Sequence, residues 1–364
     1  VVGLAASIDP QAVRAFTIGF DEPGYDEVPF ARAAAKHFGV ELVEKYVTPA
    51  DVIETLEQIA LYYDEPFGNS SVIPTYHCSL LAAAHGHQRI LAGDGGDELF
   101  AGNSRYQMQL YFSHYAKLPR LIRKRVIEPL LFNGLANVGL FPIPKARGYV
   151  RQANTPMPDR TQSYNFLHRS GVPEIFTGEF LKRCDLAGPI EHLRSVYGRV
   201  PQADILDRLL YSDWKITLAD NDLKKVTGMC ALAGIDVRFP MLDDEVVGLS
   251  QKIPSDKKLS NTQLRKFYRE ALRGILPATT LKKSKHGFGI PFGRWLQRSD
   301  ELRYMVTDSL KAFAGRGIVK PEYIESLQET IGGEDVAYYG EMIWLIVNIE
   351  RWLQARPHLA SYRL

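Results

Sequence analysis

The sequence feature that most constrains this chain is the stretch at residues 89–106, RILAGDGGDELFAGNSRY. Residues 90–92 are a short apolar run typical of a buried strand, and residues 98–100 are expected to open a helix. The turn between them consists almost only of Gly and Asp. Its glycines remove side chains that would keep the backbone away from a ligand, and they permit left-handed φ values without steric cost. We therefore predict a strand–turn–helix unit whose turn can approach a bound molecule closely.

The two aspartates of this turn, Asp94 and Asp97, are predicted at the end of a strand and the start of a helix. Open α/β sheets bind their ligands at this place. A generic turn of this composition is most often a simple connection in which an Asp caps the helix. Two carboxylates among three glycines, followed by Glu98, are more than a cap needs. Carboxylates that act together with phosphate oxygens are typical Mg²⁺ ligands, so the turn is a candidate Mg²⁺ site.

Composition and charge narrow the classes of function. The chain has 364 residues, of which 45% are hydrophobic and 24% charged, which is typical of one large globular domain or two closely joined ones. Its net charge is only +2, so no global field draws it to nucleic acid or to an anionic membrane, and we expect neither partner. The three cysteines are far apart, and there is no signal peptide or uninterrupted apolar helix. We expect a cytoplasmic protein.

The first part of the chain alternates strands with helices. Strands are predicted at residues 15–20 and 41–47, and helices at residues 28–38 and 49–61. This alternation predicts the α/β class, with a parallel sheet covered by helices on both faces. Residues 107–218 differ, since short amphipathic stretches are joined there by Pro and Gly without a motif that carries chemistry.

Further along the chain, polar residues interrupt a helical pattern at residues 218–225, and an apolar run follows at residues 229–232. One end of this helix is therefore expected in a polar pocket, and we place Asp222 among the catalytic candidates. After it, Arg238 and Asp243 are predicted to pair and fix a turn. The last candidate is Lys285, on a loop that Gly287, Gly289 and Pro291 shape and that Phe288 and Phe292 are expected to anchor in the core.

The sequence Gly-Asp-Gly-Gly-Asp-Glu-Leu-Phe at residues 93–100 resembles the signature of the asparagine synthetase family, and the resemblance extends over almost the whole chain. It implies the PP-loop ATP pyrophosphatase fold, which is adenine nucleotide alpha hydrolase-like. Residues 1–110 would form its parallel α/β nucleotide-binding core, and residues 111–364 a mainly helical part that completes the site. The family's pyrophosphate-binding loop should lie immediately before Val1, so we expect that loop and the N-terminal glutaminase domain to be missing from this sequence.

The resemblance also implies roles for single residues. Asp97 is similar to the family's Mg²⁺ ligand, and Asp94 takes the place of an acidic residue near the acyl-acceptor chemistry. Lys285 has the spacing of a lysine directed at the α-phosphate of ATP. The nucleotide would lie against Ile18, where the family's backbone meets adenine, and against Ala92, Gly93 and Gly95.

The activity that the resemblance implies is ATP-dependent amide formation with Mg²⁺. A substrate carboxylate would attack ATP to give an acyl-adenylate and pyrophosphate, and ammonia, derived from glutamine in the full-length protein, would displace AMP. Enzymes that make free asparagine often keep an Arg clamp near the position of Ser70, so free aspartate is a doubtful substrate here. The runs at 220–223 and 285–289 resemble a branch found with exopolysaccharide export, for which a sugar acid would be the acceptor. A homodimer is possible.

Two alternatives remain open. The first is a relative that closes a β-lactam ring; such enzymes often have Tyr where this chain has Asp94, which argues against it. The second is a non-catalytic relative that keeps the fold and binds a nucleotide or a partner. The presence of Asp94, Asp97 and Lys285 together argues against this second alternative.

Overall fold

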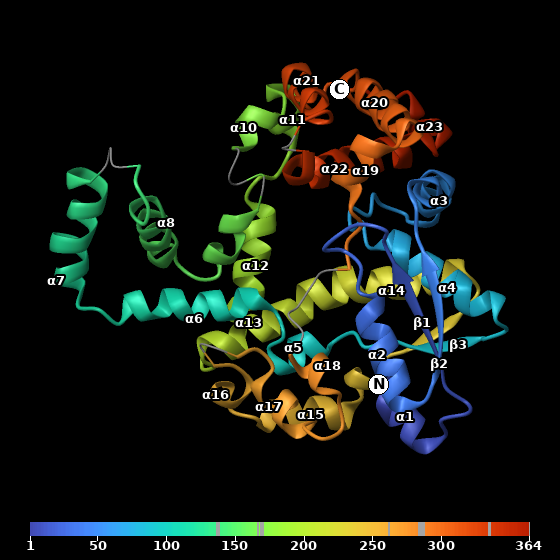
Figure 1. Cartoon of the computed structure of the whole chain (residues 1–364). Coiled ribbons are helices and arrows are strands. Elements are labelled where there is room, and N and C mark those ends of the chain that lie inside the picture. Colours follow the sequence, from blue (N-terminus) through green and yellow to red (C-terminus); the bar gives the residue numbers. More distant parts are fainter. Residues whose placement is uncertain are drawn as a thin grey trace.

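The computed structural model describes residues 1–135, 139–165, 167, 171–260, 263–282, 288–333 and 336–363. Helices dominate, and the strands form two short parallel pairs (Figure 1). The strands are β1 (Arg14–Gly19), β2 (Glu41–Tyr46), β3 (Arg89–Leu91) and β4 (Asp236–Arg238). The predicted α/β class is therefore confirmed.

The N-terminal part follows the predicted alternation of strands and helices. β1 and β2 pair in parallel, with Arg14 opposite Glu41 and Gly19 opposite Tyr46. Local signals fix the helix ends: Thr48 caps its helix by accepting a hydrogen bond from the Asp51 N–H, and Gly39 ends another with φ 65°. The helices of this part are α1 (Val2–Ile8), α2 (Val28–Phe38), α3 (Pro49–Tyr62), α4 (Val72–Ala84) and α5 (Gly96–Phe100).

The partner of β3 comes from the distant second half of the chain. β4 pairs with β3 in parallel, and Arg89 lies opposite Asp236. The predicted pair of Arg238 with Asp243 is wrong. Arg238 Nη2 instead lies 3.1 Å from the Asp236 carboxylate, and Asp243 caps α15 (Asp244–Lys252). The strand β4 thus extends the frame of the Gly/Asp turn, and the 3₁₀ turn η5 (Pro240–Leu242) follows it.

The rest of the chain is helical. α6, α7 and α8 extend away from the α/β part, and the last helices gather at the top of the view (Figure 1). The helices between α5 and β4 are α6 (Ser104–Ala116), α7 (Arg120–Ile122), α8 (Ile143–Asn154), α10 (Val172–Ile175), α11 (Gly178–Arg183), α12 (Gly188–Gly198), α13 (Ile205–Asp213) and α14 (Lys224–Leu232). After α15 follow α16 (Ser255–Lys258), α17 (Lys266–Ala271) and α18 (Ala278–Lys282), which lie in the lower part of the view (Figure 1). The last helices are α19 (Phe292–Arg298), α20 (Asp300–Ala314), α21 (Pro321–Thr330), α22 (Val336–Gln354) and α23 (Pro357–Ala360).

The largest hydrophobic core joins the two ends of the chain. Leu56 of α3 and Ile73 of α4 lie in one cluster with Leu296 of α19 and Val347 of α22, and all four are almost completely buried. The neighbouring Trp344 donates its indole N–H to the Gly68 carbonyl at 2.9 Å. The C-terminal helices therefore hold the loop that precedes α4. None of the helices that the structure describes is long and apolar enough to cross a membrane.

Candidate active site

The Gly/Asp turn adopts the predicted strand–turn–helix geometry. Ala92 extends the pairing of β3 with β4, since its N–H donates to the Arg238 carbonyl at 2.9 Å. Gly95 then has φ 90°, a conformation that side chains rarely adopt, and a Cβ there would lie 2.1 Å from Leu242 Cδ2. Only glycine fits this position. The turn thus delivers Asp97 and Glu98 into the first turn of α5, where negative charge is favourable.

A cavity of about 590 Å³ opens above this turn. Its walls come from the turn itself, from the loop before α4, from the start of α6 and from the C-terminal half. One wall belongs to the π-helical segment η4 (Trp214–Leu223), and π-helical turns often lie at functional sites. The lining includes Asn69, Ser71, Gly93, Asp94, Gly95, Asp97, Glu98, Arg105, Thr217, Asp222, Lys225, Arg265, Tyr268 and Phe288. A volume of this size is typical of a small-molecule site.

Asp97 forms an ion pair with Arg265 in this cavity. The Arg265 guanidinium donates from Nε to Asp97 Oδ1 at 2.8 Å, and its Nη2 lies 2.6 Å from the same oxygen. Arg265 has φ 52°, which is rare for a residue with a side chain, and its N–H donates to the carbonyl of Ala101, whose φ is 56°. These are the two non-glycine residues with positive φ in the described chain. Backbone strain of this kind concentrates at functional sites.

A second ion pair faces the turn from η4 and α14. Lys225 Nζ lies 3.2 Å from the Asp222 carboxylate, and Lys225 is only 8% exposed. Burial raises the pKa of Asp94 above its ordinary value; the charge of Lys225 opposes this shift, and the charges of Asp222 and Asp97 add to it. Asp94 therefore holds a proton more readily than an exposed aspartate, which suits a group that must accept one.

Glu98 is the most strongly perturbed carboxyl group of the cavity. Burial, together with the negative charges of Asp97, Asp213 and Asp222, raises its pKa to about 7. Mutual repulsion of this kind is relieved when a cation binds among the carboxylates.

The carboxylate oxygens of the cavity fit an Mg²⁺ ion that is bound jointly by the protein and by phosphate oxygens. In the described part of the chain, no three acidic, His or Cys side chains converge closely enough to hold a metal alone. Mg²⁺ usually takes one or two carboxylates and completes its shell with phosphate oxygens and water. Asp97 and Asp94 line the same cavity and present carboxylate oxygens, and the crowding of negative charge there favours a bound cation.

The structure brings together most of the residues that the sequence singled out. Gly93, Asp94, Gly95, Asp97 and Asp222 all line the cavity.

Ile18 and Ala92 do not line it. Ile18 is 3% exposed and lies in the main core, and Ala92 packs against the cluster that contains Val237. Lys285 lies outside the described residues. The expected anchors near it differ: Phe292 is buried, whereas Phe288 is 41% exposed and lines the cavity.

Sequence reasoning missed the cationic residues of the site. Lys225 stands in the polar run at 218–225, and its spacing of three from Asp222 could have suggested their pairing. Arg265 carries no local signal, because it meets Asp97 from 168 positions away. The hydrogen bond from Asn69 to Asn221, at 3.1 Å, likewise joins two polar loops that the sequence does not connect.

Comparison with known proteins identifies the family of the chain. A family model described as asparagine synthase matches residues 1–354. The chain is 23% identical over 354 residues to asparagine synthetase [glutamine-hydrolyzing] 1 of Bacillus subtilis (strain 168), which covers 97% of this chain and 53% of that protein. It is 25% identical over 324 residues to a putative asparagine synthetase [glutamine-hydrolyzing] of Mycobacterium tuberculosis (strain ATCC 25618 / H37Rv), which covers 84% and 45%.

A third relative matches a shorter segment. The chain is 34% identical over 145 residues to a putative asparagine synthetase [glutamine-hydrolyzing] 2 of Methanocaldococcus jannaschii, which covers 38% of this chain and 28% of that protein. The chain spans about half the length of the first two of these relatives. Because the family model matches nearly the whole sequence, the chain belongs to the asparagine synthase family.

Proposed function

We propose that this chain is the synthetase part of an ATP-dependent amide-forming ligase with the PP-loop ATP pyrophosphatase fold. The observation that carries the proposal is the cavity at the Gly/Asp turn, where Asp94, Asp97 and Asp222 face Lys225 and Arg265. Family membership supports the reaction class, since the curated relatives are named asparagine synthetases. The cavity volume of about 590 Å³ suits a nucleotide together with a small carboxylate.

The proposed reaction has two steps. A carboxylate oxygen of the substrate attacks the α-phosphorus of ATP, and the bond to pyrophosphate breaks, which gives an acyl-adenylate. Ammonia then attacks the acyl carbon, AMP leaves with the bonding electron pair, and the nitrogen loses a proton. The relatives are named glutamine-hydrolyzing, and we propose glutamine as the ammonia source in the full-length protein.

The residues of the cavity divide this work by charge. Lys225 lies where it can attract the negative oxygens of phosphate or carboxylate. Asp94, whose pKa is raised by burial, would accept the proton that the attacking nitrogen loses. Asp97 would hold Mg²⁺, which neutralises charge on the departing pyrophosphate when it is bound. Lys285 would act on the α-phosphate.

The test is ATP–pyrophosphate exchange in the full-length protein, with a panel of carboxylic acids and Mg²⁺. We expect exchange that depends on one class of acid and that Asp97→Asn abolishes while the fold stays intact by circular dichroism. Asp256→Asn is a matched control, because the side chain of Asp256 is 76% exposed and outside the cavity. Exchange that persists unchanged in Asp97→Asn would remove Asp97 from the metal site. Nucleotide binding without exchange for any acid would favour the non-catalytic alternative.

A further inference from the structure

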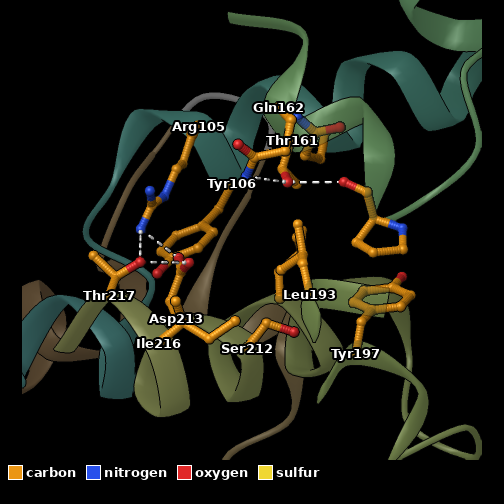
Figure 2. Close-up of a pocket in the computed structure, with 13 residues that line it drawn as sticks. Arg105, Tyr106, Thr161, Gln162, Leu193, Tyr197, Ser212, Asp213, Ile216 and Thr217 are labelled. Atoms are coloured by element: carbon orange, nitrogen blue, oxygen red, sulfur yellow. Dashed lines mark hydrogen bonds and ion pairs between the residues drawn. The ribbon is translucent and has the colours of Figure 1, made fainter. Parts of the chain in front are cut away.

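A second, more enclosed cavity of about 290 Å³ lies beside the candidate active site (Figure 2). It is formed by the start of α6, the 3₁₀ turn η3 (Asp159–Tyr164), α12, α13 and η4. Arg105 and Thr217 line this cavity and the active-site cavity alike. The two spaces are therefore neighbours that share one wall.

The shared wall carries no net charge toward the second cavity. Arg105 Nη2 lies 2.6 Å from the Asp213 carboxylate and 3.5 Å from Thr217 Oγ1, and Thr217 donates to Asp213 at 3.3 Å. Figure 2 shows these three side chains joined on one side of the cavity. Because the guanidinium and the carboxylate neutralise each other, the second cavity offers no counter-ion to a charged ligand. A neutral group fits it better.

Gln109 supplies the observation that points to a ligand. Its side chain is 2% exposed and lines the second cavity. Its Oε1 has no hydrogen-bond partner among the described residues. A buried amide oxygen without a donor costs free energy, on the order of 1–3 kcal/mol, so such groups are usually satisfied by a bound molecule or water. Oε1 accepts hydrogen bonds, so a bound group that satisfies it must be a donor, such as a hydroxyl or an amide N–H.

The other residues that line the second cavity are uncharged as well. Tyr106, Tyr197 and Ser212 are among its lining residues, and the Ser212 hydroxyl donates to the Arg208 carbonyl at 2.9 Å. Between them lie the apolar side chains of Leu193, Leu209 and Ile216. Neutral polar groups on an apolar wall suit a hydroxylated or amide-bearing carbon chain. The volume lies at the lower end for ligand pockets, which fits one part of a substrate rather than a whole nucleotide.

We propose that the second cavity is a substrate subsite that binds the neutral, hydroxyl- or amide-bearing end of the carboxylate substrate. The proposal rests on the ligase function proposed above, since it assigns the carboxylate end to the neighbouring active-site cavity. Gln109 Oε1 accepts a hydrogen bond from the neutral end, and the apolar side chains contact its carbon chain. The subsite thus selects acids that carry a donor several atoms from the carboxylate.

Direct binding tests the subsite without ATP. Saturation-transfer NMR with the full-length protein compares three six-carbon acids: gluconate, which is hydroxylated; adipamate, which ends in an amide; and hexanoate, which has no donor beyond its carboxylate. We expect gluconate or adipamate to bind more tightly than hexanoate. In Gln109→Leu this preference should fall by about threefold to tenfold, the worth of one neutral hydrogen bond. Gln88→Leu, at an exposed position, is the matched control and should keep the preference.

Stability separates a binding role from a structural one. Replacing an unpartnered buried amide by an apolar group of similar size should leave the free energy of unfolding unchanged or higher. Weaker binding in a variant of Gln109 that is at least as stable therefore supports the subsite. Equal binding of the acids to wild-type protein and Gln109→Leu, or hexanoate binding as tightly as the other two, would overturn it. If the preference holds but no acid supports pyrophosphate exchange, the ligase proposal fails and the binding site stands.

Discussion

Arg265 forms an ion pair with Asp97 in the lining of the active-site cavity, with Nη2 2.6 Å from Oδ1. A guanidinium on a proposed Mg²⁺ ligand means that the cation and Arg265 compete for the same charge. Such a pair holds the carboxylate in place before nucleotide and metal arrive.

The first prediction follows from this competition. In Arg265→Gln the positive charge is lost, so Mg²⁺ should bind more tightly and support pyrophosphate exchange at a lower half-maximal concentration. Mg²⁺-dependent thermal stabilisation, measured with an ATP analogue that is not hydrolysed, gives the same answer without turnover. An unchanged Mg²⁺ requirement would show that Asp97 and Arg265 act away from the metal.

Two glycines of the turn should respond oppositely to alanine. Gly95→Ala places a Cβ at positive φ and 2.1 Å from Leu242 Cδ2, so it should lower the free energy of unfolding by roughly 2–4 kcal/mol. Gly93→Ala meets no atom within 4 Å and should be nearly as stable as the wild type. Because Gly93 lines the cavity, its added methyl should weaken nucleotide binding instead. Urea unfolding and nucleotide titration of both variants check this, and equal stability of the two would contradict it.

Because His77 is buried, we predict that the free energy of unfolding falls in mild acid. It is 3% exposed; burial lowers its pKa below 6.5, the nearby Lys45 lowers it further, and Asp51 opposes the shift. The unfolded chain therefore takes up a proton first as the pH falls below about 6.5, and stability declines from there by up to ~1.4 kcal/mol per pH unit. Unfolding at pH 7.5 and pH 5 measures the decline. It should shrink in His77→Gln and remain in His192→Gln, whose histidine is exposed.

Free aspartate is expected to be a poor substrate. Ser70 stands near the position of the Arg clamp that the family often uses for aspartate, and a bidentate carboxylate contact is hard to replace. Asn69 beside it is already engaged with Asn221 at 3.1 Å. AMP formation across a panel of carboxylic acids measures the preference. Faster turnover of aspartate than of every larger or hydroxylated acid would contradict this prediction.

The elements of the α/β part could be predicted because their signals are local. The helix α2 has the predicted bounds, and α3 extends one residue further than predicted. Caps such as Thr48 and the glycine at 39 act within a few residues, so the sequence displays them directly. The Gly/Asp turn was predictable for the same reason, since strand, turn and helix are adjacent.

The parts of the fold and of the site that the sequence did not predict depend on residues that are distant along the chain. β4 is a three-residue strand that is stabilised by pairing with β3, 147 residues away in the register of Arg89 and Asp236. Arg265 likewise meets Asp97 of α5 only in the folded chain, and the second cavity arises where α6, η3, α12, α13 and η4 meet. Neither hydrophobic periodicity nor a helix cap in the sequence indicates such contacts between distant elements, because they result from tertiary packing.

The last prediction concerns Lys285, which lies outside the described residues. Phe288, three positions later, lines the active-site cavity, and three residues span at most about 11 Å. We propose that Lys285 reaches a nucleotide there and that its charge stabilises the transition state of adenylation. A charge that acts mainly where new charge develops should change turnover more than affinity.

The comparison of neighbouring lysines separates this role from that of a basic surface. Lys285→Ala should lower kcat of pyrophosphate exchange by a factor on the order of a hundred to a thousand, while the KM for ATP changes little. Lys282→Ala and Lys283→Ala remove the same charge from adjacent positions and should lose far less activity. Equal, small losses in all three variants would mean that Lys285 only adds to a basic surface. In that case Lys225, which is buried and lines the cavity, becomes the main cation for the phosphate groups.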